Sequence, residues 1–561
     1  MECENCGNIT DKKNEVDAKN YHKRLKIEKT DKIFVCDRCA NDFNERSSCI
    51  NKIIKEGTDK DVIVAGAGTG KTYTFREYIH KFNKDDPIYI ATFINNLVDD
   101  LKKELKQELE ERNIKINTFH KFCYHLLQLL GKNYFYLGSL TDLIIEDAAI
   151  IEDKLIDKNK LKKYLNYYKA NIDVKYYFER GNYYNAVGND NICFALLKVL
   201  KDRCGIDLKE KYKQIIIDEY QDFNFTESSI IKIISENNKI LIAGDDDQTL
   251  YTFKDSHPKY IRELWGDPKF SKFTLPFCNR CPEVIVDSFN HFILKIKELG
   301  LLQDRIPRDY KCYFPDKYSD SRKYSKIFWH RTSIRKANTK SVENILINDI
   351  SKYVADREIE AGKLNFLIIC PDSRNIIFKK IKENVINELN NSGLTIVDHK
   401  KKKEENYLSI EIGYSLLKKN KDSNLGWRII INKDPLQGWE NLIKDSKNKN
   451  IAELLPEDYK IKHLKLSNEL KDKEPVAEDS CEEGINILFT NLYGPKGLSA
   501  DHVFILFPQD GIFPQDPSNI EEDEVYKFLV AITRSKKSLK FITTYPHSSK
   551  FISMLPKENI V

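Results

Sequence analysis

The feature that most restricts the fold of this chain is an apolar run that leads into a glycine-rich segment ending in Gly-Lys-Thr. Residues 61–72 read DVIVAGAGTGKT. A strand, a glycine-rich turn and a helix N-terminus in this order turn several backbone N–H groups toward one oxyanion. The lysine then reaches the β- and γ-phosphates, and the threonine hydroxyl binds Mg²⁺. The residues expected to form this nucleotide site are Ala65, Gly66, Ala67, Gly68, Thr69, Gly70, Lys71 and Thr72.

A second apolar run ends in two adjacent carboxylates, in the sequence QIIIDEYQD at residues 214–222. An Asp-Glu pair by itself is more often found on a protein surface. After a phosphate-binding strand, however, it places Asp218 where it holds Mg²⁺ through water and Glu219 where it orients or deprotonates the attacking water. Together the two segments predict a nucleoside triphosphatase.

Short β-branched runs alternate with amphipathic stretches in two groups, within residues 61–245 and 365–545. Buried strands that alternate with helices are typical of parallel sheets with crossover helices. A longer helical segment interrupts each group, at about 126–210 and 416–484. The pattern predicts an α/β protein with two parallel-sheet domains, each carrying a mainly helical insertion.

The N-terminal segment contains two Cys-x-x-Cys pairs, Cys3/Cys6 and Cys36/Cys39. Four thiolates in two such pairs suit tetrahedral Zn²⁺, and the long spacing favours a treble-clef-like unit or an elaborated zinc ribbon. Too few apolar residues lie here for an independent core, so the metal would supply folding free energy. Free thiols are the alternative.

Further segments, in chain order, resemble the motifs of the UvrD/Rep/PcrA-like superfamily 1 DNA helicases. The resemblance covers about residues 61–540. Beyond the P-loop and the DEYQD segment, it rests on ATFIN at 91–95, NTFH at 117–120, AGDDDQTLY at 243–251, LPFCNR at 275–280, YGPKGL at 493–498 and LVAITR at 529–534.

The resemblance implies two RecA-like P-loop NTPase domains with an ATP cleft between them. It divides the chain into a zinc-finger-like module at 1–45, domain 1A at 46–118 and 212–277, helical insertion 1B at 119–211, domain 2A at 278–415 and 485–561, and a reduced 2B-like insertion at 416–484.

The resemblance also implies roles for individual residues. Arg280 and Arg534 would be arginine fingers that reach the nucleotide when the domains close, Gln248 would sense the γ-phosphate, and Gly497 would line the nucleotide site. Aromatic rings that stack on bases would form a track for a single strand, although aromatic residues after strands are also commonly buried. The residues expected to contact DNA are Phe93, Asn95, Thr118, His120, Tyr251 and Phe253.

Composition narrows these expectations. Lys and Arg number 91 against 86 Asp and Glu, a net charge of +5, so a cationic coat is excluded and DNA-binding cations must gather in a groove. No apolar run approaches the roughly 20 residues of a membrane span, and the acidic, polar N-terminus does not resemble a signal peptide. We therefore expect a cytoplasmic protein without a membrane partner, whose thirteen cysteines do not form a disulfide framework.

The function implied by the resemblance is ATP- and Mg²⁺-dependent 3′–5′ movement on single-stranded DNA with unwinding of tailed duplexes, as in DNA repair. One alternative is a nucleic-acid-stimulated sensor ATPase in a multi-protein complex, such as an antiviral defence system with a partner nuclease. A second alternative is an RNA-directed enzyme. No glutamine that could read adenine occurs at residues 45–55, so the preference for ATP over other nucleotides stays open.

Overall fold

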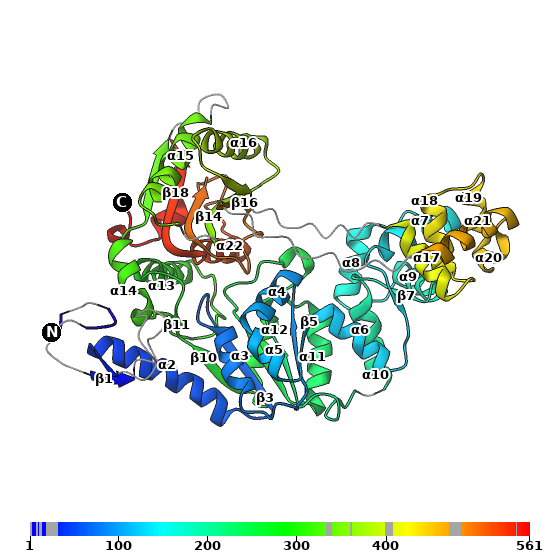
Figure 1. Cartoon of the computed structure of the whole chain (residues 1–561), viewed down its shortest axis with the longest axis horizontal. Helices are drawn as coiled ribbons and strands as arrows, with labels where there is room; N and C mark the ends of the chain where they lie inside the picture. The colour runs from blue at the N-terminus through cyan, green and yellow to red at the C-terminus, as the bar shows by residue number, and fades with distance from the viewer. Residues whose placement is uncertain are drawn as a thin grey trace.

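The computed structural model describes residues 3–6, 9–10, 14–17, 32–203, 205–332, 339–359, 362–398, 408–470, 484–545 and 547–561. Two six-stranded parallel sheets with covering helices occupy one side of the molecule, and the helices of two insertions extend to the other side (Figure 1). The predicted α/β class with two parallel-sheet domains is confirmed.

The first sheet, in domain 1A, has the strand order β10-β3-β9-β8-β4-β5 with every neighbouring pair parallel. The strand that precedes the P-loop lies in its interior, beside the strand that precedes Asp245, and the strand that precedes Asp218 is the next one along the sheet. The carboxyl ends of these strands therefore meet at one edge, where a nucleotide binds in open α/β sheets. The strands are β3 (Lys60–Ala65), β4 (Ile88–Thr92), β5 (Ile114–Thr118), β8 (Gln214–Ile217), β9 (Ile240–Gly244) and β10 (Ser271–Leu275).

Helices cover both faces of this sheet. A capping box starts α11, where the Asn224 side chain accepts from the backbone of Glu227 and the Glu227 carboxylate accepts in return from the Asn224 backbone. The helices of this domain are α3 (Lys71–Ile79), α4 (Asn95–Glu104), α5 (Lys106–Glu111), α11 (Phe225–Asn237) and α12 (Lys259–Gly266), with short 3₁₀ turns η2 (Tyr220–Asp222) and η3 (Thr252–Lys254).

The second sheet, in domain 2A, has the order β13-β18-β17-β14-β16-β15, again all parallel. Its strands are β13 (Phe328–Thr332), β14 (Leu364–Cys370), β15 (Ile396–Asp398), β16 (Ile485–Asn491), β17 (Ala500–Leu506) and β18 (Ser535–Thr544). Its other elements are β11 (Phe277–Cys278), β12 (Lys311–Cys312), α13 (Glu283–Glu298), α14 (Phe314–Lys323), α15 (Lys340–Ala355), α16 (Ile376–Asn391), α22 (Glu522–Ile532), α23 (Lys550–Ser553) and η4 (Lys557–Asn559).

The segment expected to form insertion 1B, residues 119–211, divides into two parts. Helices α6 (Phe119–Leu129) and α10 (Ile192–Asp202) share the apolar core of the first sheet, so they belong structurally to domain 1A. The part that projects from the domain consists of β6 (Phe135–Tyr136), α7 (Leu140–Glu152), α8 (Lys158–Asn166), α9 (Ile172–Tyr183) and β7 (Ala186–Val187).

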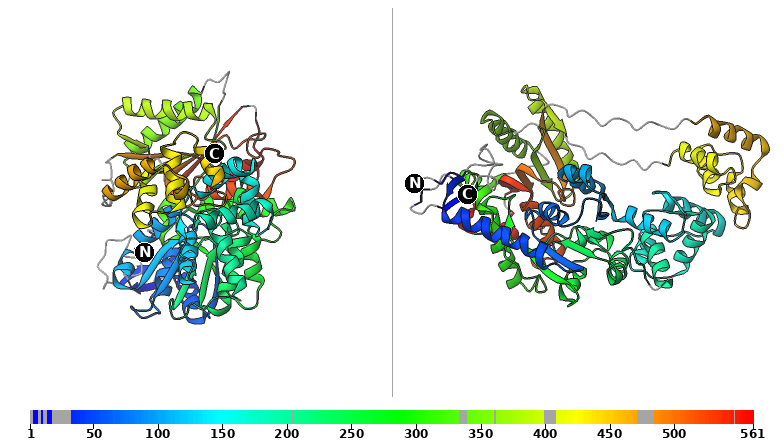
Figure 2. Two further views of the ribbon diagram at one scale, coloured as in Figure 1. Left: turned by 90° about the vertical axis from the view of Figure 1, so that its right-hand side faces the viewer. Right: turned by 60° about the horizontal axis from the view of Figure 1, so that its bottom comes forward.

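The second insertion begins earlier than the expected residue 416. Helix α17 (Ile410–Lys419) packs through Leu417 with the helix that follows it, α18 (Asn424–Lys433), and belongs to the insertion. The helices that follow are α18 (Asn424–Lys433), α19 (Trp439–Asp445), α20 (Ile451–Leu454) and α21 (Glu457–Glu469). They share one apolar core with α7–α9 of the first insertion, and Figure 2 shows the two groups side by side.

A buried ionic network also joins the two insertions. The Asp147 carboxylate in α7 accepts from Arg180 Nε of α9 at 2.6 Å and from Arg428 Nε of α18 at 2.8 Å. Arg180 donates in addition to the Ser446 hydroxyl, beyond α19, at 2.9 Å. Asp147 and Arg428 are fully buried. Because the same carboxylate binds arginines from both insertions, the two helical groups pack as one unit.

The N-terminal module contains the antiparallel strands β1 (Asn14–Asp17) and β2 (Lys32–Val35), followed by α2 (Asp37–Glu56). The expected boundary at residue 45 falls inside this helix, since α2 continues into domain 1A, where Ile50 and Ile53 join the core.

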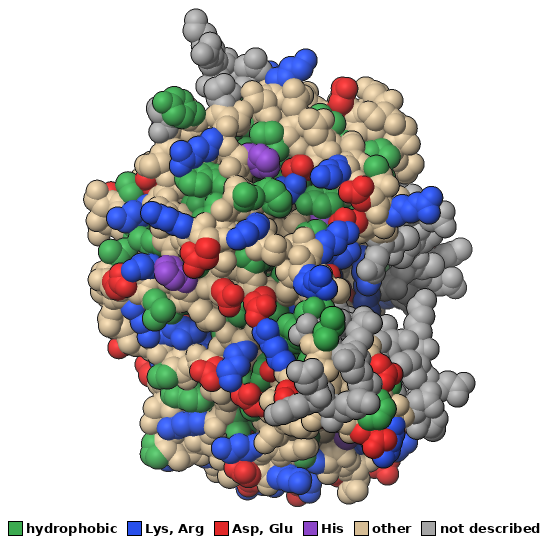
Figure 3. Space-filling model, turned by 90° about the vertical axis from the view of Figure 1, so that its left-hand side faces the viewer, with side chains coloured by type: hydrophobic (Ala, Val, Ile, Leu, Met, Phe, Trp, Pro, Cys, Tyr) green, Lys and Arg blue, Asp and Glu red, His purple; other side chains and the backbone are tan. Residues whose placement is uncertain are grey.

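On the face seen in Figure 3, basic and acidic side chains are interspersed. None of the described helices is both long and apolar enough to cross a membrane.

Candidate nucleotide and DNA site

The P-loop follows β3 and leads into α3. Gly68 and Gly70 have φ angles of +68° and +86°, which glycine adopts without strain. A Cβ on Gly68 would stand 2.4 Å from Cβ of Arg280 in domain 2A, so the loop also needs glycine for close approach. The Thr69 hydroxyl donates to the Gly66 carbonyl at 2.9 Å and stiffens the turn.

A cavity of about 900 Å³ lies over this loop, with walls from both sheet domains. Ala65 is buried beneath it at the end of β3. The cavity brings together thirteen of the residues that the sequence assigned to the nucleotide site, which come from both domains. They are Gly66, Ala67, Gly68, Thr69, Gly70, Lys71, Thr72, Asp218, Glu219, Gln248, Arg280, Gly497 and Arg534.

Lys71 and Glu219 are the closest pair in the cavity. Lys71 Nζ donates to Glu219 Oε1 at 2.5 Å, and Gln221 Nε2 donates to the other carboxylate oxygen at 2.6 Å. Burial alone would raise the pKa of Glu219, but Lys71 and then Lys496 hold that pKa well below its usual range. Glu219 is therefore an ionised acceptor, as a residue that orients or deprotonates water must be.

Asp218 lies beside this pair. Its Oδ1 accepts from the Glu219 backbone at 2.9 Å and stands 3.8 Å from Lys71 Nζ. Burial raises the pKa of Asp218 to about 6. Thr72 lines the same cavity, so a hydroxyl and a carboxylate, both oxygen donors of the kind Mg²⁺ prefers, are available together. These two residues fit the predicted Mg²⁺ site.

Lys496 is a residue of this site that the sequence reasoning missed. Its ammonium group contacts the Asp222 carboxylate, stands 3.4 Å from Glu219 Oε2, and donates to the Gln248 carbonyl at 3.1 Å. Burial raises the pKa of Asp222 to about 6 despite this contact. The YGPKGL segment predicts only Gly497 as a residue of the nucleotide site. Its lysine, the cationic residue of that segment, was the available signal.

Arg534 crosses from domain 2A to the end of β9. Its guanidinium donates to Gln248 Oε1 at 2.6 Å, and the Gln248 amide in turn donates to Asp245. Arg534 is 2% exposed and makes no ion pair within the described residues. Burial, with the nearby charge of Arg280, lowers the pKa of Arg534 to about 9. A buried cation without a carboxylate partner, facing a phosphate-binding loop, is suited to an anionic ligand.

The three aspartates of the AGDDDQTLY segment all form ion pairs with arginines of the protein. Arg308 forms ion pairs with Asp245, Asp246 and Asp247. Arg305 Nε adds a contact with Asp247 at 2.9 Å. Because arginines already neutralise this group, the three acids serve to anchor the segment after β9. Arg308 is a second residue that the sequence reasoning missed.

The expected DNA-contacting aromatics form a cluster, but its members differ in exposure. Phe93 is 8% exposed and packs against Tyr251, with ring centroids 5.2 Å apart. Phe253 is 62% exposed and lies edge-on to Tyr493 of domain 2A at 5.4 Å. The Phe93 ring is therefore part of the apolar core in this structure, and its stacking on a base stays a prediction.

The remaining residues expected on the DNA track lie at the N-termini of α4 and α6, and their contact with DNA stays a prediction. Thr118 is the N-cap of α6, where its hydroxyl accepts from the Lys121 backbone at 3.3 Å, and it is buried. Asn95 is the first residue of α4 and is half-buried. His120 is half-buried, with Nε2 3.8 Å from the carboxylate of Glu227.

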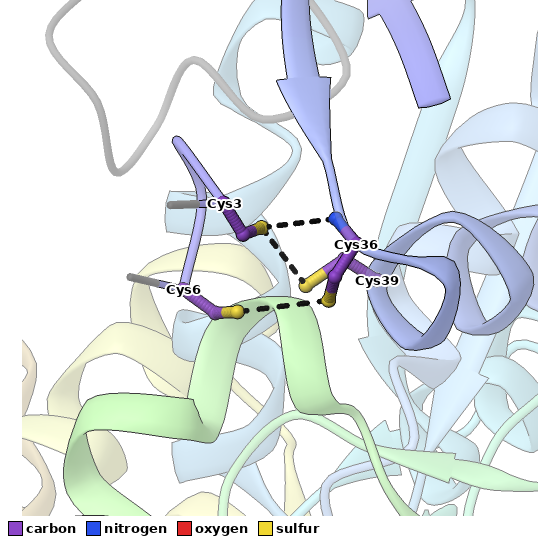
Figure 4. A group of neighbouring side chains, drawn as sticks. All are labelled: Cys3, Cys6, Cys36 and Cys39. Carbon is purple, nitrogen blue, oxygen red and sulfur yellow. Dashed lines mark hydrogen bonds between the residues drawn. The ribbon is translucent and has the colours of Figure 1, made fainter. Parts of the chain in front are cut away.

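The four cysteines of the N-terminal module converge (Figure 4). The sulfur atoms of Cys6 and Cys36 are 3.7 Å apart and those of Cys3 and Cys39 are 4.0 Å apart. All four lie within 4.8 Å of one another. Tetrahedral Zn²⁺ with Zn–S bonds of about 2.3 Å separates its ligand sulfurs by about 3.8 Å. The cluster therefore fits a structural zinc ion.

Comparisons with known proteins agree with this geometry. The AAA domain family matches residues 50–254. The ATP-dependent DNA helicase Rep of Buchnera aphidicola subsp. Acyrthosiphon pisum is 24% identical, over 89% of this chain and 96% of that protein. A probable DNA helicase II homolog of Mycoplasma genitalium is 25% identical, over 87% of this chain and 83% of that protein. Over most of its length, the chain is thus similar to proteins named as Rep and DNA helicase II type DNA helicases.

Proposed function

We propose that the protein is an ATP-dependent DNA helicase that couples ATP hydrolysis to 3′–5′ movement on single-stranded DNA and to duplex unwinding. The observation that carries the proposal is the nucleotide cavity between two parallel-sheet domains, which contains Lys71 and Glu219 from one domain and Arg534 from the other. The relatives named as DNA helicases over most of the chain support the choice of DNA as the track.

A short chain segment connects the cavity with the exposed aromatic ring. Gln248, which bonds Arg534, is followed within five residues by Tyr251 and Phe253. The same segment is tied to domain 2A by the Thr252 hydroxyl, which donates to Asp523 at 2.6 Å. A change in the separation of the domains would therefore move Phe253, and hydrolysis would change the grip on a base.

Two assays test the proposal. Hydrolysis of ATP should rise on addition of single-stranded DNA, and a duplex with a 3′ tail should be separated while one with a 5′ tail is not. Lys71→Ala serves as the inactive control in both. Hydrolysis that ignores DNA would overturn the motor proposal, and separation of the 5′-tailed duplex alone would overturn the polarity.

One observation favours a second candidate, a nucleic-acid-stimulated ATPase with little unwinding. The second insertion shares a core and the Asp147 network with the first, so large movements between the insertions would expose buried charge. DNA- or RNA-stimulated hydrolysis without separation of either tailed duplex would favour this candidate.

A DNA substrate and a four-thiolate zinc site both suit a reducing compartment. We accordingly propose a cytoplasmic location, with ATP, Mg²⁺ and Zn²⁺ as cofactors.

A further inference from the structure

Helix α2 connects the cysteine cluster with the nucleotide cavity. Cys36 is its N-cap and Cys39 lies in its first turn, whereas Ile50 and Ile53 near its other end pack into the core of domain 1A. In Figure 1 the helix runs from beneath α14 toward β10 and β3. One rigid element therefore spans both sheet domains, with the cysteines at the end that lies on domain 2A.

Contacts between the cysteine module and domain 2A are specific. The Asn5 amide donates to the Pro315 carbonyl at 2.8 Å, and the Phe314 backbone donates to Asp42 of α2 at 3.2 Å. The Arg38 guanidinium lies 3.8 Å from the centroid of the Phe314 ring, which belongs to the same buried cluster as the four cysteines. The geometry of the cysteine cluster therefore determines where the first half of α2 sits on domain 2A.

Arg46, near the middle of α2, enters the nucleotide cavity. Its guanidinium carbon lies 4.6 Å from the ring centroid of Tyr313 in domain 2A and 5.2 Å from that of Tyr73 in α3. A Cβ on Gly70 would stand 3.3 Å from Arg46 Nη2, so the side chain borders the last glycine of the P-loop. Within the described residues Arg46 has no ion-pair partner; its Nη2 donates to the Asn279 side-chain oxygen at 2.7 Å, and its buried Nε has no hydrogen-bond partner.

We propose that the cysteine module is a zinc-dependent strap across the nucleotide cavity, in which α2 presents Arg46 as a stacking cation for the base of the bound nucleotide. The inference rests on the proposed use of ATP. A planar guanidinium beside tyrosine rings offers a stacking surface for any purine. Stacking is tolerant of base identity, so the strap binds adenine and guanine nucleotides alike.

Zinc acts on this surface through the first turns of α2. The apolar core around the four cysteines is small, and bound metal supplies much of the free energy that orders such a module. Without the metal, Ile50 and Ile53 still hold the second half of α2, but the first half loses its attachment to domain 2A. Arg46 lies between the two halves, so its position beside Tyr313 and Tyr73 depends on the metal.

Equilibrium binding of a fluorescent ATP analogue to the full chain tests whether Arg46 contacts the base of the nucleotide. Arg46→Ala should weaken binding on the order of tenfold, a loss within the range of a desolvated cation–π contact. Arg46→Lys should bind the analogue about as weakly as Arg46→Ala, because lysine keeps the charge but lacks the planar group that stacks on the base. Lys52→Ala, on the exposed face of α2, is the matched control and should bind as the wild type. Competition by inorganic triphosphate should be the same in all four proteins.

The dependence on zinc is tested by repeating the nucleotide-binding measurement after the metal has been removed with a chelator. Zinc content and circular dichroism are measured in parallel. Chelation should weaken binding by the wild type and Lys52→Ala, but cause no further loss in Arg46→Ala, because the two changes remove the same contact. Additive losses, or wild-type affinity in Arg46→Ala, would overturn the inference. If the wild type bound no nucleotide at all, the proposed function itself would fail, which is a distinguishable result.

Discussion

Arg534 of domain 2A donates a hydrogen bond of 2.6 Å to the side-chain oxygen of Gln248 in domain 1A, although the two residues are 286 positions apart. The side-chain amide of Gln248 donates to the Asp245 carboxylate, and the backbone carbonyl of Gln248 accepts from Lys496 at 3.1 Å. Cations of one domain are thereby attached to the end of a strand in the other. Phosphoryl transfer between these groups would draw on both domains, which gives hydrolysis a means of moving them.

Arg534→Ala should slow ATP hydrolysis on the order of 10³-fold, the range found for arginine fingers. The affinity for ATP should change little, because the P-loop contacts remain. The measurement is single-turnover hydrolysis at saturating ATP together with equilibrium binding. Arg374→Ala, whose side chain is 90% exposed in the same domain, is the control. A loss of affinity with an unchanged hydrolysis step would contradict the finger role.

Glu219→Gln should bind ATP yet hydrolyse it roughly 10²- to 10⁴-fold more slowly, because the amide cannot accept a proton from water. The substitution also removes the negative partner of Lys71, so ATP affinity should not fall. Lys71→Ala provides the contrast and should lose nucleotide binding. Near-normal turnover in Glu219→Gln would remove the role assigned to that carboxylate.

Phe253→Ala should weaken binding of single-stranded DNA by about 1–3 kcal/mol, the usual range for one stacked base. Thermal stability should stay near that of the wild type, because the ring is 62% exposed. Phe93→Ala is the informative companion. Its ring is buried, so this variant should lose roughly 3–5 kcal/mol of stability. Equal DNA affinity in Phe253→Ala and the wild type, measured by fluorescence anisotropy, would exclude Phe253 from the track.

Asp147→Ala should destabilise the paired insertions by about 3–5 kcal/mol, because Arg180 and Arg428 would lose the carboxylate that both of them bind. Urea denaturation combined with limited proteolysis measures the effect. Asp142→Ala, on the same helix in an exposed pair with Lys158, is the control and should change stability by less than about 1 kcal/mol. Equal stability of both variants would show that the network does not join the insertions.

Purified protein should contain one zinc ion per chain, measured by atomic emission. Replacing Cys36 and Cys39 together by Ser should remove it, since two of the four thiolates at the cluster are lost. Cys49→Ser, a change on the same helix outside the cluster, should keep the metal. Wild-type protein without zinc after purification in zinc-containing medium would end the metal assignment.

Local sequence was sufficient wherever the chemistry depends on neighbours in the chain. The P-loop and the Asp218–Glu219 pair each follow an apolar strand directly, and their contacts lie along one sheet edge. Lys496 and Arg308 were missed because their partners lie far away in sequence. Asp222, the partner of Lys496, is 274 residues distant, so the lysine of YGPKGL is visible as a cation in the sequence but its contact with Asp222 is not.

The sequence also could not show which aromatic side chains are exposed to solvent. Phe93 and Phe253 both come soon after a strand of the first sheet, yet one ring is in the core and the other is in solvent. The difference arises because Phe93 is covered by Tyr251 and Phe223, which come from other segments. The same reason explains the domain boundaries, because α6 and α10 were assigned to an insertion but pack on the first sheet.

By itself, the sequence determined the α/β class, the phosphate-binding loop, the paired acids and the cysteine pairs, because strand periodicity, glycine conformation and ligand spacing act over a few residues. Only the tertiary structure decided that Arg534 bonds Gln248, that the two insertions share a core, and that α2 carries Arg46 from the cysteine cluster into the nucleotide cavity. These relationships join segments that meet only when the two domains pack, and burial and charge pairing depend on that packing.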